Sequence, residues 1–220
     1  MQNRDEKPSI PENHSVKAVI PAGGLGTRFH PFSLAVPKEL LPVNRKPLIH
    51  WAVEEAFIAE IRDIGIVIRK GKEMIQDYFE ALMGSPSPSG ESGQHELNKG
   101  KLHFIRQERP SGLGNAIYES GGFLNDSPFI MIIPDQLILS KVPATTQLLH
   151  AASGDVQAIW SSVVAISRKQ LHLFPGARSF ELTTMRKNIW LVRGIRNDSE
   201  SSPEKRLIGF GRTFFPAGIR

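Results

Sequence analysis

The stretch VKAVIPAGGLGTR, residues 16–28, decides the fold. Its first six residues, Val16–Pro21, form a short apolar run with β-branched Val19 and Ile20, which is the pattern of a buried strand. Glycines follow at once, so the strand is predicted to turn directly into a loop. A strand that ends in a glycine loop is typical of α/β proteins, which bind their ligands at the carboxyl ends of parallel strands.

The alternation of strand and helix patterns continues beyond this stretch. Apolar residues recur on one helical face over Lys46–Glu60, and Ile64–Ile68 is a second β-branched run. The same patterns predict helices at Glu73–Met83, Gly114–Gly121 and Pro143–Ala152, and strands at Leu102–Arg106, Phe129–Pro134, Gln157–Ile166, Ser179–Thr183 and Ile189–Val192. This order predicts an α/β protein with a Rossmann-like, mostly parallel sheet flanked by helices.

Length and composition fit one substantial core or two small ones, because the chain has 220 residues of which 40% are hydrophobic. Residues 1–15 mix charges and prolines without periodicity, so we expect a disordered tail there. Gly84–Gly93 is almost entirely Gly, Ser and Pro, which predicts a flexible surface loop over residues 84–100. We expect residues 16–220 to form a single domain, with Asn197–Lys205 as a polar loop.

The charge is unevenly distributed along the chain. The net charge is +5, yet residues 168–220 contain 11 basic and 4 acidic residues, so the rest of the chain is slightly acidic. A nucleic-acid groove would interleave basic residues with stacking rings along one face, and aromatic residues make up only 8% of this chain. We therefore expect a small anionic ligand and no nucleic acid.

The absence of cysteine excludes disulfides, thiolate metal sites and a cysteine nucleophile. The first residues are polar, and the longest apolar run, near Phe129–Ile133, is far shorter than the roughly 20 residues of a membrane-spanning helix. We expect a soluble, cytoplasmic protein without a membrane partner.

The glycine loop is the densest chemical signal. Without side chains, Gly23, Gly24 and Gly26 allow backbone N–H groups to surround a phosphate oxygen. The loop is not a dinucleotide fingerprint, because Phe29 stands where the third glycine belongs, and no Gly-Lys-Ser/Thr follows to make a P-loop. An ordinary tight turn between a strand and a helix would use the same glycines.

Two cations follow the glycines. Arg28 and Lys38 are separated by prolines, which predict an irregular extended path that brings both charges to one polyphosphate with no regular element between them. Taken singly, each would also fit a solvated surface cation.

At this point the sequence resembles a known family. Gly24-x-Gly-Thr-Arg-x-x-Pro31, followed by Pro37-Lys38, is similar to the signature of sugar-1-phosphate nucleotidyltransferases. Residues 22–42, with Lys46-Pro-Leu-Ile and Glu54-Glu-Ala, resemble the bacterial UTP:glucose-1-phosphate uridylyltransferases in particular. Arg106–Ala116 resembles the family's base-recognition segment, and Ile133-Pro-Asp135 resembles the strand end that carries a metal-binding aspartate.

The resemblance implies a nucleotide-diphospho-sugar transferase fold and an enzyme of UDP-glucose biosynthesis. The reaction is attack of a sugar 1-phosphate, here glucose 1-phosphate, on the α-phosphorus of UTP, with Mg²⁺ as cofactor and pyrophosphate as the leaving group. The residues it implies are Arg28 and Lys38 as catalytic cations, Asp135 as the Mg²⁺ ligand, and Ala22, Gly23, Gly24, Gly26, Thr27, Gln107 and Gly112 for the nucleotide.

These assignments agree with the chemistry of the residues. The Gln107 amide can pair with the imide edge of uracil, and Gly112 allows a flat base to approach the backbone. Asp135 offers a hard oxygen ligand that suits Mg²⁺. Without the other motifs, the Gln107 segment would also fit a hairpin turn, and Asp135 would fit a turn residue or helix cap.

The C-terminal part departs from the family. Its Glu-Lys-Pro strand end and second metal-binding aspartate are not recognisable, and Phe174-Pro-Gly176 and Gly211-Arg-Thr-Phe-Phe are the remaining similarities. Arg193 and Arg196 are candidate substitutes for the missing lysine, and we prefer Arg193 because it directly follows the apolar run Ile189–Val192. With Gly176, Arg193 is the predicted sugar-phosphate residue.

The chain stops at Arg220, so we expect a shortened, incomplete C-terminal part. Two functions fit the sequence: a uridylyltransferase, or a truncated or divergent homologue that binds nucleotide without turnover. A homo-oligomer is a further expectation. A nicotinamide dehydrogenase ranks far behind, because the third fingerprint glycine is absent.

Overall fold

The computed structural model describes residues 16–84, 100–153, 158–167, 169, 179–186, 189–196 and 205–218. The chain divides into two compact units, one comprising Met1–Trp160 with Gly211–Arg220 and the other comprising Ser161–Phe210. The predicted tail, residues 1–15, lies outside the described residues, and so do residues 85–99 of the predicted loop. No helix in the described part of the chain is long and apolar enough to cross a membrane.

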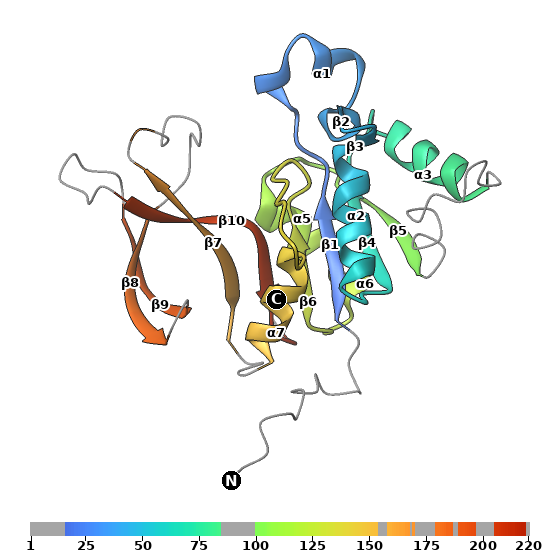
Figure 1. Ribbon diagram of the computed structural model, residues 1–220. Helices are drawn as coiled ribbons and strands as arrows, with labels where there is room; N and C mark the ends of the chain where they lie inside the picture. Colours follow the sequence, from blue (N-terminus) through green and yellow to red (C-terminus); the bar gives the residue numbers. More distant parts are fainter. Residues whose placement is uncertain are drawn as a thin grey trace. The chain divides into compact units, whose positions relative to one another are not determined.

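The sheet of the first unit contains four neighbouring strands that run parallel to one another (Figure 1). These strands lie in the order β5-β4-β1-β6, with bounds β1 (Lys17–Pro21), β4 (Asp63–Ile68), β5 (Lys101–Arg106) and β6 (Phe129–Ile132). In the register, Ala18 of β1 lies opposite Ile64 of β4 and Ile130 of β6. The end of β10 (Lys205–Phe215) runs antiparallel to β6. The predicted mostly parallel sheet is confirmed.

Helices cover both faces of this sheet because successive strand residues point to opposite sides. One core contains Ile20 of β1 and the other contains its neighbour Val19. The longer helices are α2 (Leu48–Ile58), α3 (Met74–Gly84), α5 (Leu113–Glu119) and α7 (Ala144–Ala152), with the short α6 at Gly121–Leu124. Residues of α2, α3 and α7 belong to the core with Ile20, whereas residues of α5 and α6 belong to the core with Val19.

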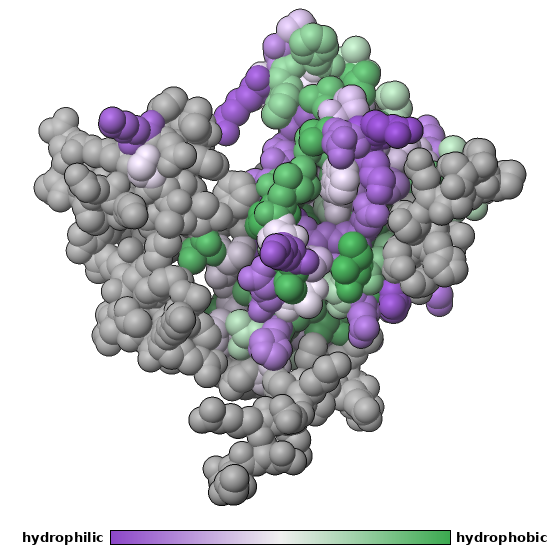
Figure 2. Space-filling model, viewed as in Figure 1, coloured by the Kyte–Doolittle hydropathy of each residue, from purple (hydrophilic) through white to green (hydrophobic). Residues whose placement is uncertain are grey.

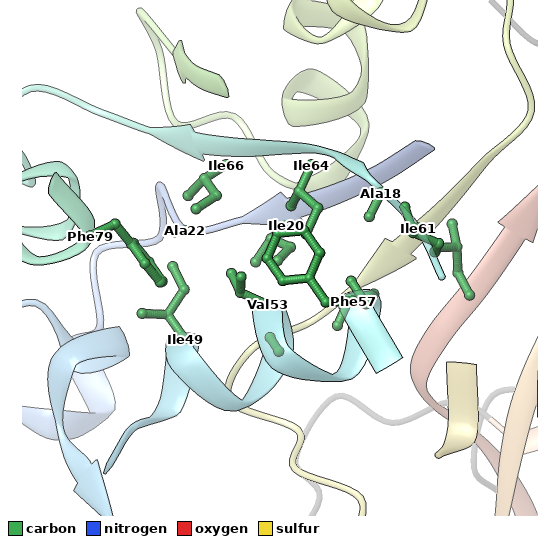
Figure 3. Close-up of a cluster of buried hydrophobic side chains, with 14 of the residues drawn as sticks. Ala18, Ile20, Ala22, Ile49, Val53, Phe57, Ile61, Ile64, Ile66 and Phe79 are labelled. Atoms are coloured by element: carbon green, nitrogen blue, oxygen red, sulfur yellow. The ribbon is translucent and has the colours of Figure 1, made fainter. Parts of the chain in front are cut away.

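The larger core lies between β1, β4 and α2. Figure 3 shows Ile49, Val53 and Phe57 of α2 facing Ile20 and Ile64 of the strands, and all five side chains are at most 1% exposed. Burial of each such side chain contributes about 1.5–3 kcal/mol. This packing holds rigid the strand that leads into the glycine loop.

Two helices of the first unit differ from the sequence prediction. The helix expected from Lys46 begins at Leu48, because Lys46–Pro47 forms the short strand β3, which pairs with β2 (Pro42–Val43). The helix expected at Gly114–Gly121 is divided into α5 and α6 at Ser120, whose hydroxyl donates back to the Ala116 carbonyl at 2.8 Å.

The second unit contains β8 (Ser179–Arg186), β9 (Ile189–Arg196), most of β7 (Trp160–Ser167) and the first part of β10. β8 and β9 are antiparallel and longer than predicted. At Arg193 the pairing shifts register, because its neighbours Val192 and Gly194 lie opposite the adjacent residues Leu182 and Glu181. Of the predicted polar loop, residues 197–204 lie outside the described residues.

Candidate functional site

Three loops leave the carboxyl ends of the parallel strands at one edge of the sheet. Ala22, directly after β1, donates its N–H to the Val67 carbonyl at 2.8 Å, so the glycine loop begins beside the end of β4. Gln107, directly after β5, donates its N–H to the Ile68 carbonyl at 2.8 Å. Asp135 lies three residues beyond the end of β6. The parallel topology therefore brings together segments that are far apart in the sequence.

The Lys38 side chain lies along the glycine loop. A β-carbon placed on Gly24 would come within 3.8 Å of Lys38 Cε, and one placed on Gly26 within 3.4 Å of Lys38 Cδ. Gly26 also accepts a hydrogen bond from the Ser33 hydroxyl at 2.7 Å. The lysine stem thus packs against the bare backbone of the loop, where side chains at positions 24 and 26 would meet it.

The Lys38 ammonium forms an ion pair with the Asp135 carboxylate. Both side chains are only partly buried, with 17% and 25% of their surfaces exposed, so a ligand can reach them. A cation and a hard oxygen ligand therefore stand side by side above the glycine loop.

A second, buried ion pair supports this arrangement, and sequence reasoning missed it. Lys72 Nζ donates to Glu39 Oε2 at 2.7 Å and to the Ala22 carbonyl at 2.6 Å. Burial lowers the pKa of the Lys72 ammonium, although the Glu39 carboxylate opposes that shift. Since Glu39 follows Lys38 in the short helix η2 (Lys38–Leu40), the pair ties the start of the glycine loop to the segment that carries Lys38.

Gln107 packs against the glycine loop at Gly23. The residue is 4% exposed, and a β-carbon on Gly23 would lie only 2.3 Å from Gln107 Oε1, so a side chain at position 23 would have to displace the Gln107 amide. Gln107 Nε2 donates to Asn115 Oδ1 at 2.6 Å and to the Gly112 carbonyl at 3.4 Å. Gly112 has a φ of +101°, which side chains rarely tolerate, and α5 begins directly after it. The hairpin alternative is therefore wrong.

Behind Asp135, a buried Arg212–Glu55 cluster fixes the loop after β6. Arg212, on β10, donates to the carbonyls of Ile133 and Gln136 at 3.4 and 3.2 Å, on either side of Asp135. It also donates through Nε to Glu55 Oε1 at 3.0 Å, and Glu55 accepts two further hydrogen bonds from Thr145.

The charge state of Glu55 follows from these contacts. Burial by itself would raise the pKa of Glu55, but the hydrogen bonds and charge of Arg212, together with the bonds from Thr145, outweigh burial and lower it. Glu55 is therefore a stable carboxylate partner for Arg212.

The segment between Arg28 and Lys38 is not an extended path. It contains η1 (Thr27–Phe29) and α1 (Phe32–Ala35), and Pro31 stands at the N-cap of α1, where its missing N–H costs nothing. Arg28 and Thr27 are exposed on η1. The chain between the two cations therefore passes through two short helices, and Arg28 remains on the loop that carries the glycines.

The same segment exposes apolar side chains (Figure 2), namely Leu25, Phe29, Phe32 and Leu34, which are 38–74% exposed. Its shape is held by local hydrogen bonds, including Phe29 N–H to the Gly26 carbonyl at 2.8 Å and Val36 N–H to the Phe32 carbonyl at 3.0 Å. A segment held in this way opens at low cost in free energy.

Neither predicted sugar-phosphate residue belongs to the described part of the first unit. Gly176 lies outside the described residues, and Arg193 lies on β9 of the second unit. Within the described part of the chain, no three His, Cys, Asp or Glu side chains are grouped to hold a metal ion, so Asp135 stands as a single carboxylate.

Comparison with known proteins gives the family. Residues 17–172 match the family model described as nucleotidyl transferase. A UTP–glucose-1-phosphate uridylyltransferase of Bacillus subtilis is 37% identical over 160 residues, which are 69% of this chain and 53% of that protein, so the chain spans about half the length of this relative.

Solved structures agree with the sequence relatives. A UDP-glucose pyrophosphorylase complexed with UDP-glucose matches with a TM-score of 0.78 at 25% identity, over 91% of this chain and 75% of the other. A UTP-bound UGPase from Acinetobacter baumannii matches with a TM-score of 0.74 at 25% identity, over 91% and 74% of the two chains. The chain therefore belongs to the nucleotidyl transferase family.

Proposed function

We propose that this protein transfers a uridylyl group from UTP to glucose 1-phosphate, giving UDP-glucose and pyrophosphate. The observation that carries the proposal is the convergence of the glycine loop, the Lys38–Asp135 pair and Gln107 at one carboxyl edge of a parallel sheet. Similarity to the UTP–glucose-1-phosphate uridylyltransferase of Bacillus subtilis supports UTP and glucose 1-phosphate as the substrates.

The nucleotide lies across the glycine loop in this proposal. Backbone N–H groups of Gly23, Gly24, Gly26 and Thr27 face the phosphates, where side chains on the glycines would obstruct them. Ala22 anchors the start of this nucleotide loop, because its own N–H is bonded to the Val67 carbonyl. Gln107 and Gly112 receive the base on the other side of Gly23. Contact between Gly23 and Gln107 supports a continuous surface from phosphate to base.

Lys38 and Arg28 neutralise the phosphates. In the free protein, the Asp135 carboxylate holds the Lys38 ammonium over the glycine loop. An arriving triphosphate offers the ammonium a second, more highly charged partner, and Arg28 on η1 adds a planar fork for phosphate oxygens. Fixed cations at this place also stabilise charge on the transferring phosphorus.

Asp135 is the proposed Mg²⁺ ligand. A single carboxylate fits this ion, because Mg²⁺ keeps several waters and takes its remaining ligands from substrate phosphates. When bound, Mg²⁺ supplies charge neutralisation between the two anionic substrates. Arg212 contributes by holding the carbonyls on both sides of Asp135.

The reaction requires no protein nucleophile. A phosphate oxygen of glucose 1-phosphate forms a bond to the α-phosphorus of UTP, and the bond from that phosphorus to the bridging oxygen of pyrophosphate breaks. The attacking phosphate is already ionised near pH 7, so no general base is needed. The protein contributes orientation and charge stabilisation.

For the second substrate, glucose 1-phosphate, we propose Gly176 and Arg193 as the binding residues. We also propose that residues 16–220 act as a single domain. Titration with glucose 1-phosphate in the presence of UTP tests this side, and we expect Arg193→Ala to weaken the sugar-phosphate affinity. Undiminished affinity would remove Arg193. We further propose that the reaction takes place in the cytoplasm and that the protein forms a homo-oligomer, which light scattering tests.

The second candidate function is nucleotide binding without turnover, favoured by the sequence, in which the family's Glu-Lys-Pro strand end and second metal-binding aspartate are not recognisable. Pyrophosphate release with UTP, Mg²⁺ and a panel of sugar 1-phosphates decides between the two. Turnover is expected with glucose 1-phosphate, and Lys38→Ala should reduce it about 10²–10³-fold. UTP binding without pyrophosphate release from any sugar would establish the non-catalytic function, and absence of UTP binding would contradict both.

A further inference from the structure

Two carboxylates lie within ion-pair distance of the Lys38 ammonium. One is Asp135, its partner above the glycine loop. The other is Glu39, whose Oε1 lies 4.0 Å from Lys38 Nζ. The Glu39 side chain is 1% exposed and the Asp135 side chain is 25% exposed, so Asp135 holds the ammonium where a ligand can reach it and Glu39 would draw it inwards. The balance between the two carboxylates therefore decides whether Lys38 is available to a ligand.

The Lys72 ammonium weakens the attraction of Glu39 for Lys38. Lys72 Nζ donates to the second Glu39 oxygen, Oε2, at 2.7 Å, and to the Ala22 carbonyl at 2.6 Å. The Lys72 and Glu39 side chains are 5% and 1% exposed, so salt and water screen this pair little. Burial lowers the pKa of Lys72, Glu39 opposes that shift and the Lys38 charge adds to it, since both ammoniums lie near the same carboxylate. Lys72 thus neutralises Glu39 on the side away from Asp135's partner atom, Lys38 Nζ.

We propose that Lys72 is a positioning residue of the nucleotide site, which neutralises Glu39 and so leaves the Lys38 ammonium to Asp135 and to the phosphates of the ligand. This inference rests on the proposed nucleotide site. Lys72 acts through Lys38 and does not contact the ligand, because its side chain is 5% exposed and its ammonium donates to two protein oxygens.

Removal of the Lys72 charge changes the partner of Lys38. A buried carboxylate without a cation carries a large desolvation cost. In the part of the chain that the structure describes, Lys38 and Lys72 are the only cations within 4.0 Å of the Glu39 carboxylate. Lys38 is therefore the cation that replaces Lys72, and the phosphates lose an ammonium that Asp135 had held within their reach.

Calorimetric titration of UTP into the wild type, into Lys72→Met and into Lys72→Met combined with Glu39→Leu tests this role. We expect Lys72→Met to bind UTP at least about tenfold more weakly, the scale of a lost hydrogen bond to a charged group. The double variant should recover most of this affinity, because no carboxylate at position 39 then attracts Lys38. Lys72→Gln should show the same loss if Lys72→Met does not fold, since its amide can still donate to the Ala22 carbonyl but carries no charge.

Ile61→Ala separates this role from a general loss of stability. Ile61 is 3% exposed and lies two residues before β4, at the amino edge of the sheet and thus away from the glycine loop. Its truncation costs stability on the same scale as the loss of one partner from a buried ion pair. The folded Ile61→Ala protein should nevertheless bind UTP like the wild type. Equal losses of UTP affinity in Ile61→Ala and Lys72→Met would overturn the proposal, as would a double variant that recovers none of the affinity.

Failure of the nucleotide site gives a different result from failure of this inference. If the wild type does not bind UTP, the site itself is wrong and the inference falls with it. If the wild type binds UTP and folded Lys72→Met binds it equally well, the site stands and the inference is wrong. Lys38→Ala should weaken UTP binding in the wild type but add little to Lys72→Met, because Lys38 is already withdrawn there, and fully additive losses would overturn the proposal.

Discussion

Substitution of Arg212 by Met is expected to destabilise the protein strongly. The guanidinium and the Glu55 carboxylate are buried, with side-chain exposures of 1% and 9%. Arg212→Met removes the cation and leaves Glu55 with only the hydrogen bonds from Thr145. Loss of one partner from a buried ion pair typically costs about 3–5 kcal/mol. A domain with a total stability of about 5–15 kcal/mol is then close to unfolding.

Urea denaturation followed by circular dichroism measures this cost. Arg106→Met is the matched control, because Arg106 pairs with Glu73 at 3.2 Å on the exposed surface. Its free energy of unfolding should be nearly unchanged. Arg212→Met combined with Glu55→Leu should recover much of the loss, since both charges are then removed. If Arg212→Met and Arg106→Met lose equally little stability, the cluster does not fix the loop after β6.

Three further predictions concern the charged residues Glu55, Lys72 and Arg28. The pKa of Glu55 is lowered in the folded protein, so the Glu55 carboxylate stabilises the fold fully above its ordinary pKa of 4.5. This contribution to the free energy of unfolding is lost as pH falls through the lower pKa of the folded state. Urea titrations between pH 3 and 7 should therefore show a loss of stability in acid that is smaller in Glu55→Gln. Lys72→Met should cost about 3–5 kcal/mol by urea denaturation, and Glu39→Leu in the same chain should restore part of it; an additive loss would contradict the pairing. Arg28→Ala should reduce turnover about 10²–10³-fold in a pyrophosphate assay, and an unchanged rate in the folded variant would remove Arg28 from the mechanism.

Most of the first unit could be predicted from the sequence because its signals are local. Val16–Pro21 and Ile64–Ile68 carry β-branched runs, and the face with Ile49, Val53 and Phe57 repeats at helical spacing. The element boundaries that differ from the prediction are set by features other than hydrophobic periodicity. Lys46 and Pro47 pair with β2 as a short strand, so α2 begins only at Leu48. The path from Arg28 to Lys38 closes into short helical turns that no periodicity reveals.

The candidate site was predictable only where residues lie in one continuous motif. The glycines and Lys38 are close in sequence, and their meeting with Gln107 and Asp135 follows from parallel topology. The Lys72–Glu39 and Arg212–Glu55 pairs are separated by 33 and 157 positions, and polarity alone does not show that such charges are buried. Glu55 gave one usable signal, because it lies at the border of the apolar face of α2.

In the proposed site, the nucleotide lies over the glycine loop between Lys38 and Gln107. Calorimetric titration of UTP into Gly23→Ala tests it most directly, because the new β-carbon would lie 2.3 Å from Gln107 Oε1 and must displace that side chain. Gly121→Ala is the control, since a β-carbon there meets nothing within 4 Å. We predict that Gly121→Ala binds UTP like the wild type and that folded Gly23→Ala binds it at least about tenfold more weakly, the scale of one lost hydrogen bond. Equal UTP affinity in the two folded variants would contradict the claim.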